Sequence, residues 1–167
     1  VGNLLTRPLS SKLFGAAVCQ VPLLDMKVYS RLLAGASWMA EYGDPDKEEE
    51  WSFLRKFSPY HVLRHDILNE PEEAAPLSLD GAAQPDWKCP KVLFTTSTRD
   101  DRVHPGHARK MVRALIEEAQ PRGMADTVYY WENVEGGHGG AADNKQRAKM
   151  WALTYSFLKQ TLGLEEN

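Results

Sequence analysis

The segment at residues 91–107, KVLFTTSTRDDRVHPGH, limits what this chain can fold into more than any other part of the sequence. It opens with apolar and β-branched residues, which predict a buried strand that ends in the polar cluster at residues 97–102. Pro105 and Gly106 then mark a turn. Apolar residues recur at helical spacing beyond them, which predicts a helix at about residues 106–119. The loop between strand and helix holds two acids and an arginine, and such loops bind ligands at the carboxyl ends of strands in α/β sheets.

A second predicted strand leads into an equally unusual loop. Residues 127–131 predict the strand, and NVEGGHGGAAD follows, in which four glycines flank His138. Glycines permit unusual backbone angles and close approach of another segment, which a core histidine does not need. With one helix and one strand between them, Asp100 and His138 are expected at neighbouring strand ends, as the acid and base of a nucleophilic triad. The alternative for the first loop is a helix N-terminus with solvated charges and a local ion pair.

The remaining pattern completes an α/β fold. Residues 16–20 are apolar and small, which predicts a buried parallel strand, and residues 1–7 predict the second half of an amphipathic helix. Further helices are predicted at residues 25–34, 46–57 and about 144–162. Strands that alternate with helices in this way predict a parallel sheet flanked by helices.

Three finer predictions accompany this outline. The helix at residues 46–57 should end at Ser58, because a residue before proline disfavours the α-helical region. Residues 68–88 are rich in proline, alanine and acids without any period, which predicts a surface insertion. The last helix carries an apolar stripe typical of one packed face, made of Ala148, Trp151, Ala152, Tyr155, Leu158 and Leu162.

The composition argues against several classes of function. A net charge of −3 argues against a nucleic acid or an anionic membrane as partner. No apolar run approaches the roughly 20 residues that a membrane helix needs, and no signal peptide or phosphate-binding glycine loop is recognisable. The histidine pairs at 61/65 and 104/107 lack a third ligand, so no metal or other cofactor is predicted. The two cysteines have no metal-like spacing and are predicted to be reduced thiols of a cytoplasmic protein.

The nucleophile of such a triad is not evident in the sequence. There is no Gly-x-Ser-x-Gly, and the nearest pattern, GASWM at residues 35–39, lacks the second glycine. A nucleophile elbow also needs a strand before its serine and a helix after it, whereas this pattern follows a predicted helix. The chain opens with valine, inside what its pattern predicts to be a helix. We therefore expect that a preceding portion has been lost and that the serine lay directly upstream of Val1.

Five segments together resemble one family of proteins. They are FGAAVCQVPLLDM, GASWMAEYGDP, KFSPYHV, VLFTTSTRDDRVHPGHARKM and EGGHGGAADN, in the order of prolyl oligopeptidase-type serine peptidases. They cover nearly the whole chain apart from residues 68–88. The chain thus resembles the carboxyl-terminal part of the family's catalytic domain, which has an α/β-hydrolase fold. The resemblance implies one partial domain at residues 1–167, without the nucleophile elbow and the propeller that family members carry further upstream.

The resemblance also implies roles for individual residues. Asp100 matches the triad acid and His138 the triad base. Arg102 matches the arginine that binds a backbone carbonyl of the peptide, and Tyr42 matches a motif tyrosine near the oxyanion. The pocket for a substrate proline is implied by Trp38, which stacks on the ring, and by Val103 and Leu23, which line the pocket.

The implied function is hydrolysis of short peptides after proline by a Ser-His-Asp mechanism, with a peptide as the partner and no cofactor. Because the serine is missing, the isolated chain is expected to be inactive. An esterase or acylaminoacyl hydrolase of the same fold stays open as an alternative, as does a non-catalytic binding fragment. Loss of a neighbouring strand would expose an edge at residues 16–20, so association through that edge is also expected.

Overall fold

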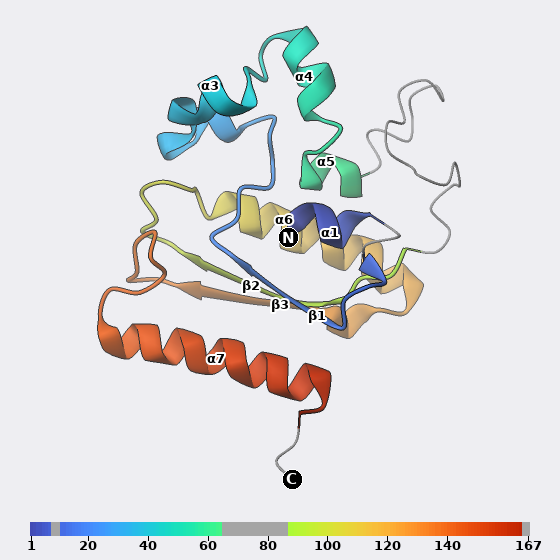
Figure 1. The fold of residues 1–167 in the computed structure, drawn as a ribbon, viewed down its shortest axis with the longest axis vertical. Helices are drawn as coiled ribbons and strands as arrows, with labels where there is room; N and C mark the ends of the chain where they lie inside the picture. The colour runs from blue at the N-terminus through green and yellow to red at the C-terminus, as the bar shows by residue number, and fades with distance from the viewer. Residues whose placement is uncertain (8–10, 65–86, 165–167) are drawn as a thin grey trace.

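The computed structural model of this chain describes residues 1–7, 11–64 and 87–164. At its centre lies a parallel three-stranded sheet in the order β1, β2, β3 (Figure 1). Strand β1 spans Ala16–Gln20, β2 spans Lys91–Ser97 and β3 spans Val128–Asn133. The three strands predicted from the sequence are confirmed. Strand β2 is buried at every position after Lys91, because it is paired on both sides and covered on both faces.

Helices cover both faces of the sheet (Figure 1). Helix α7, Asn144–Leu162, lies along one face, and α6, Gly106–Ala119, lies along the other. On the α6 side, α5, Pro59–Leu63, packs against α6 and against α1, Gly2–Thr6. The short 3₁₀ helices η4, Gln120–Arg122, and η5, Ala125–Thr127, connect α6 to β3. This is the predicted α/β architecture, with a parallel sheet between layers of helices.

The main hydrophobic cluster lies between the sheet and α6. It consists of Leu5, Cys19, Leu24, Leu63, Trp87, Cys89, Val92, Phe94, Met111, Ala114, Leu115 and Ala119. Both cysteines are buried free thiols, and burial raises the pKa of Cys19 to about 12, so this thiol stays protonated at neutral pH. Within the described residues, no helix is both long enough and apolar enough to cross a lipid bilayer.

The helix predicted at residues 25–34 is wrong. The chain instead forms two 3₁₀ helices, η1, Tyr29–Arg31, and η2, Leu33–Trp38, and then the short α3, Met39–Tyr42. Leu32 between the 3₁₀ helices is extended, and Leu33 has a φ of 50°, so no continuous helix can pass through them. The apolar spacing reflects a second hydrophobic cluster of Met26, Tyr29 and Leu54, against which Leu23, Trp38, Met39, Trp51 and Phe57 pack.

Ser58 and Pro59 begin a helix rather than end one. Helix α4, Glu48–Leu54, ends before residue 57, and Ser58 is the residue that precedes α5, with Pro59 in its first turn. Proline suits that position because its fixed φ is helical and the backbone N–H it lacks has no partner inside the helix. A Ser-Pro dipeptide can mark the end of one helix or the start of the next. Here it marks the start of α5, and the sequence prediction that it ends the preceding helix is wrong.

Trp87, near the end of the segment predicted as a surface insertion, is buried. Residues 68–86 of the predicted insertion lie outside the described residues, so only Trp87 and Lys88 test the prediction. Trp87 is 5% exposed and belongs to the main cluster, and its Nε1 donates a hydrogen bond to Leu5 O at 2.8 Å. The prediction is wrong at Trp87, which anchors the start of β2 to α1.

Helix α7 has the predicted bounds but uses a different face. Met150, Thr154 and Phe157 are its buried residues, whereas Trp151 is 41% exposed and Tyr155 is 63% exposed. The rings of Trp151 and Tyr155 stack on each other 5.7 Å apart. Positions 150, 154 and 157 share the helical spacing of the predicted stripe, so periodicity alone does not decide which of two adjacent faces meets the sheet.

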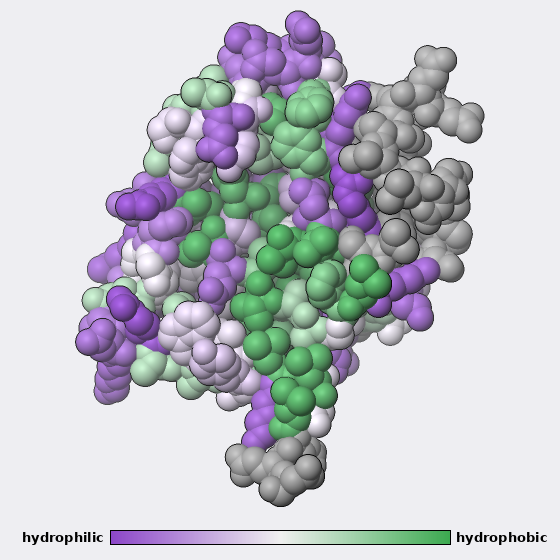
Figure 2. Space-filling view, viewed as in Figure 1, coloured by the Kyte–Doolittle hydropathy of each residue, from purple (hydrophilic) through white to green (hydrophobic). Residues whose placement is uncertain are grey.

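Strand β1 lies at one edge of the sheet and pairs with β2. Figure 2 shows hydrophobic surface that continues from α1 over β1 to the C-terminal end of α7. Leu4 of α1, Leu13 and Phe14 ahead of β1, and Leu162 and Leu164 at the end of α7 are exposed. Association through this edge stays a prediction.

Candidate active site

The loops that follow the three strands leave the sheet at the same edge. The register aligns the ends of β1, β2 and β3, and all three strands run in parallel. Val21 directly follows β1, Asp100 lies in the loop after β2, and His138 lies in the loop after β3. Side chains far apart in the sequence therefore converge at the carboxyl edge, where α/β sheets bind ligands.

Asp100 and His138 form a hydrogen-bonded pair. His138 Nδ1 lies 3.0 Å from each carboxylate oxygen of Asp100. Asp100 Oδ1 also accepts the backbone N–H groups of Arg102 at 2.8 Å and Val103 at 2.9 Å, so the carboxylate is held in one orientation. A carboxylate only accepts, so His138 Nδ1 carries the proton and Nε2 is left as the acceptor. The side chain of Asp100 is fully buried and that of His138 is 32% exposed, so the imidazole is the reachable member of the pair.

Asn133 and two glycines shape the loop that carries His138. The Asn133 side-chain amide donates a hydrogen bond to Gly140 O at 2.9 Å. A Cβ at Gly136 would lie 2.7 Å from both of these atoms, the Asn133 Nδ2 and the Gly140 O. Gly140 has a φ of 78°, and a Cβ there would lie 2.7 Å from Met150 Sδ. The close approach expected of this glycine-rich loop is therefore found at Gly136 and Gly140, where an added Cβ would clash with these neighbouring atoms.

A cavity of about 490 Å³ opens beside His138. Six of the seven predicted site residues line it, and Asp100, the seventh, lies behind His138. Three lining residues were not predicted. Val21 could have been found because it directly follows a strand, and Ala34 and Ser37 could have been found because they flank Trp38. The full lining is Val21, Leu23, Ala34, Ser37, Trp38, Tyr42, Arg102, Val103 and His138.

The lining combines an apolar wall with a few polar groups. Leu23, Trp38 and Val103 supply apolar surface, while Arg102, which is exposed, supplies a fixed positive charge. Desolvation is the main reason that the pKa of Tyr42 lies above its ordinary value, and the negative charge of Glu41 raises it further. The Tyr42 hydroxyl therefore keeps the proton that a hydrogen-bond donor needs. Such a lining suits a ligand with an apolar body and an adjacent carbonyl or anionic oxygen.

Two residues at this cavity hold strained backbone angles. Val21 has a φ of 39° and Leu33, next to the lining residue Ala34, has a φ of 50°. Each costs about 1–3 kcal/mol and persists only where the surrounding structure imposes it. Hydrogen bonds hold both segments, from the Val21 N–H to Thr95 O at 2.8 Å and from the Ala34 N–H to Arg102 O at 3.3 Å.

Neither Ser37 at the cavity nor Ser58 beside His61 forms a triad with His138. Ser37 lines the cavity, but its hydroxyl donates to Ala34 O at 2.6 Å inside a 3₁₀ turn rather than at a strand-to-helix elbow. Ser58 lies 2.8 Å from His61 Nδ1, and the same nitrogen lies 3.9 Å from Asp25. A triad needs its serine and its acid on different ring nitrogens, and Ser58 is fully buried, so this second grouping is structural.

His104 has a structural role at the start of α6. His104 Nδ1 accepts the backbone N–H of Gly106 at 3.0 Å and so caps the start of α6. In the part of the chain that the structure describes, no three His, Cys, Asp or Glu side chains gather as a metal site. His65, the partner of His61 in the sequence, lies outside the described residues.

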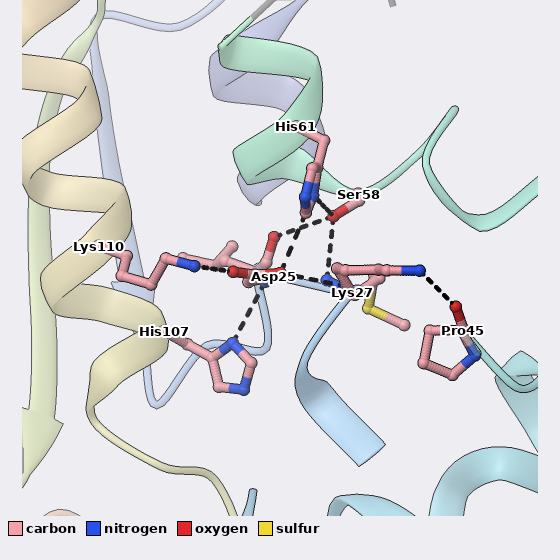
Figure 3. Close-up of polar contacts among 9 residues, drawn as sticks. Asp25, Lys27, Pro45, Ser58, His61, His107 and Lys110 are labelled. Carbon is pink, nitrogen blue, oxygen red and sulfur yellow. Dashed lines mark hydrogen bonds and ion pairs between the residues drawn. The ribbon is translucent and has the colours of Figure 1, made fainter. Parts of the chain in front are cut away.

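A buried histidine holds the loop that brings Leu23 to the cavity. His107 of α6 is 2% exposed, and its Nδ1 accepts the backbone N–H of Asp25 at 3.2 Å (Figure 3). An accepting Nδ1 requires a neutral ring. Burial lowers the pKa of His107 from 6.5 to about 4, and the charges on Lys110 and His104 act in the same direction while Asp25 opposes them.

Acid is therefore expected to destabilise the fold through His107. Because the folded pKa lies below the unfolded one, this contribution is fully present above pH 6.5 and is lost as the pH falls towards 4. We expect a loss of up to about 3 kcal/mol in the free energy of unfolding over that range. Urea unfolding at several pH values measures it, with His107→Gln as comparison, since its amide oxygen can accept the same N–H without titrating. Equal pH dependence of the two proteins would contradict the prediction.

Comparisons with known proteins identify the family of this chain. The sequence profile of the prolyl oligopeptidase family matches residues 4–165. The uncharacterized peptidase y4nA of Sinorhizobium fredii is 45% identical over 150 residues, which are 90% of this chain and 17% of that protein. The prolyl oligopeptidase ophP of Omphalotus olearius is 30% identical over 166 residues, 98% of this chain and 20% of that protein.

Solved structures of the same kind superpose on the chain. A prolyl endopeptidase matches with a TM-score of 0.73 and 32% identity, over 98% of this chain and 20% of that one. A post-proline cleaving enzyme from Rickettsia typhi matches with a TM-score of 0.71 and 30% identity, over 99% of this chain and 20% of that one. The chain thus spans about a fifth of the length of these relatives. With a profile match over nearly its whole length, this chain belongs to the prolyl oligopeptidase family.

Proposed function

We propose that these residues supply the base and the acid of a serine peptidase that cleaves short peptides after proline. One observation carries the proposal: the buried, backbone-held Asp100 carboxylate binds Nδ1 of a histidine that lines a cavity with both apolar and polar walls. That pairing is what a triad requires of its acid and base. The family to which the chain belongs is one of peptidases.

In the proposed mechanism His138 moves the proton. Its Nε2 accepts the proton of the attacking serine and later gives it to the departing amine. Asp100 holds the imidazole in the required tautomer and stabilises the imidazolium that forms. The serine itself comes from polypeptide outside residues 1–167, in keeping with relatives about five times as long as this chain. In the same proposal, residues 1–167 form only part of the α/β-hydrolase domain.

The cavity lining supports the preference for proline. A pyrrolidine ring is flat and apolar and suits stacking on the Trp38 indole, with Leu23 and Val103 as the other walls. In this proposal the Arg102 guanidinium, which lines the cavity, binds a carbonyl oxygen of the peptide backbone. Tyr42, as a protonated hydroxyl, donates towards the oxyanion.

The 167-residue chain by itself is expected to lack turnover and to resist labelling by a fluorophosphonate probe. A probe of this class needs a serine activated by a neighbouring base, and the hydroxyl of Ser37 donates to a backbone carbonyl instead. Intact-mass spectrometry after labelling provides the readout. Stoichiometric modification of Ser37 or of any other serine would contradict the proposal. The DNA sequence upstream of the Val1 codon adds an independent check, because the proposal needs an in-frame serine elbow there, whereas a non-catalytic fragment needs none.

Replacing Trp38 by alanine is expected to reduce cleavage after proline selectively. Loss of an aromatic stacking contact is expected to lower kcat/KM for a Gly-Pro anilide about 3- to 10-fold. Hydrolysis of a small nitrophenyl ester, which has no proline ring to stack, should change less than about twofold. The assays use a longer polypeptide that contains these residues together with its serine. An equal loss on both substrates, or a wild-type preference for esters or acylated amino acids, would favour the esterase or acylaminoacyl hydrolase alternative.

The cytoplasmic location stays a prediction. Its support is that Cys19 and Cys89 are both free and buried in the main hydrophobic cluster. Free thiols are the usual state of cysteines in a reducing compartment.

A further inference from the structure

The loop at residues 21–27 forms one wall of the cavity and joins the two hydrophobic clusters. Val21 and Leu23 line the cavity, Leu24 is buried in the main cluster, and Met26 is buried in the second cluster. Val21 also keeps a φ that a β-branched residue adopts only when its surroundings impose it. The position of this wall therefore depends on the contacts that fix residues 24–27.

Asp25 lies at the centre of those contacts (Figure 3). It is 1% exposed, and its carboxylate is paired with the ammonium of Lys110 from α6. The second carboxylate oxygen accepts the backbone N–H of Lys27 at 3.1 Å and lies 3.9 Å from His61 Nδ1 of α5. The backbone N–H of Asp25 binds His107, also from α6. One buried carboxylate thus ties the loop to two helices.

The neighbouring backbone groups are fixed as well. The N–H of Met26 donates to Ser58 Oγ at 3.0 Å, and the N–H of Tyr60 donates to Leu24 O at 3.0 Å. Lys110 Nζ also lies 4.3 Å from the centre of the Tyr60 ring, which holds the ammonium beside Asp25. Removing the Asp25 charge would therefore loosen the junction at its most connected point.

The helix that holds Asp25 is continuous with another part of the cavity lining. His107 and Lys110 lie in the first turns of α6, and the loop just before α6 contributes Arg102 and Val103 to the cavity. The contacts of Asp25 run to α5, α6 and its own loop rather than to Asp100 or His138. Asp25 can therefore change the fit of the pocket without changing the acid–base pair.

We propose that Asp25 is a positioning residue for substrate selectivity: through His107 and Lys110 it fixes Leu23 relative to Val103 and so sets the fit of the residue that binds beside Trp38. The inference deepens the proposed function and rests on it. A loosened pocket weakens substrate binding while the proton-transfer groups stay in place, so the effect falls on KM rather than on kcat.

The test compares variants in the longer polypeptide that carries these residues and its serine. Asp25→Asn and Lys110→Met are expected to raise KM for a Gly-Pro anilide about tenfold while kcat changes less than about threefold. Lys110→Arg keeps the positive charge and should stay within about threefold of the wild-type KM. Arg113→Met is the matched control: it removes an ion pair with Glu117 at 2.6 Å on the same helix, on an exposed face. It should leave both constants unchanged.

A measurement without catalysis separates the outcomes. In the 167-residue chain, amide hydrogen exchange at residues 21–27 should be about tenfold faster in Asp25→Asn and Lys110→Met, and unchanged in Arg113→Met. If His138→Ala abolishes hydrolysis but Asp25→Asn leaves KM unaltered, this proposal fails alone. If the wild type hydrolyses no peptide, or His138→Ala still does, the proposed function fails. In that case the exchange rates still test whether Asp25 fixes the loop at residues 21–27. Exchange rates in Asp25→Asn equal to those of the wild type would overturn the positioning role as well.

Discussion

Asp100→Asn is expected to lower kcat about 10⁴-fold with little change in KM or in stability. The reason is the tautomer of His138. An asparagine has the shape of aspartate, and its oxygen can keep the two backbone N–H donors that Asp100 Oδ1 accepts at 2.8 and 2.9 Å. Its NH₂ group then faces His138 Nδ1, which must become an acceptor, so the proton moves to Nε2. An imidazole protonated at Nε2 cannot take the proton of a serine.

The neighbouring acid provides the control for this prediction. Asp101 is exposed, so Asp101→Asn makes the same chemical change one residue away and should alter kcat less than about twofold. Steady-state hydrolysis of a Gly-Pro anilide by the longer polypeptide measures the effect. Nitrogen-15 shifts of His138 in the 167-residue chain report the tautomer directly. An Asp100→Asn protein that keeps more than about a tenth of wild-type kcat would contradict the role given to Asp100.

The elements that the sequence predicted well are those whose signals are local. Strand β2 and helix α6 follow from the run at residues 92–96 and from the apolar spacing after Gly106, because one continuous segment carries each signal. The helix predicted at residues 25–34 was wrong because its apolar spacing serves a small cluster with Leu54, a contact that no local pattern shows. Trp87 was predicted in a loop for the same reason: its partners are Leu5 and the main cluster.

The candidate site divides in a similar way. Residues with a motif signal, such as Asp100 and His138, were predicted, and the structure brings them together. Val21 and Ala34 were not predicted, although Val21 directly follows a strand and Ala34 lies near Trp38; the strained backbone angles at residues 21 and 33, which accompany their place in the lining, have no motif in the sequence. Asp25 was not either, because its partners His107 and Lys110 come from a helix more than 80 residues later in the chain. Long-range contacts of single polar residues leave no periodic trace in a sequence.

Gly35→Ala is expected to destabilise the fold by at least about 3 kcal/mol, the upper range for an overpacked site. A Cβ at this position would lie 1.7 Å from Tyr29 O and 2.6 Å from Tyr29 C, far inside any contact distance. Tyr29 cannot move aside, because it is fully buried, its ring packs edge-on against Tyr42, and its hydroxyl is hydrogen-bonded to Gly43 O. The methyl group must therefore separate η1 from η2, and it carries Ala34 and Trp38 of the cavity lining with it.

Thermal unfolding of the 167-residue chain measures this effect as a fall in Tm of about 6–12 °C for a domain of this size. Gly123→Ala is the matched control. Gly123 has a φ of 74° and no atom within 4 Å of an added Cβ, so its substitution tests backbone strain without a clash. It should cost only about 1 kcal/mol. If the two variants lose the same stability, then the contact between Gly35 and Tyr29 is not what holds η2 in place, and the position of Trp38 must depend on the second hydrophobic cluster alone.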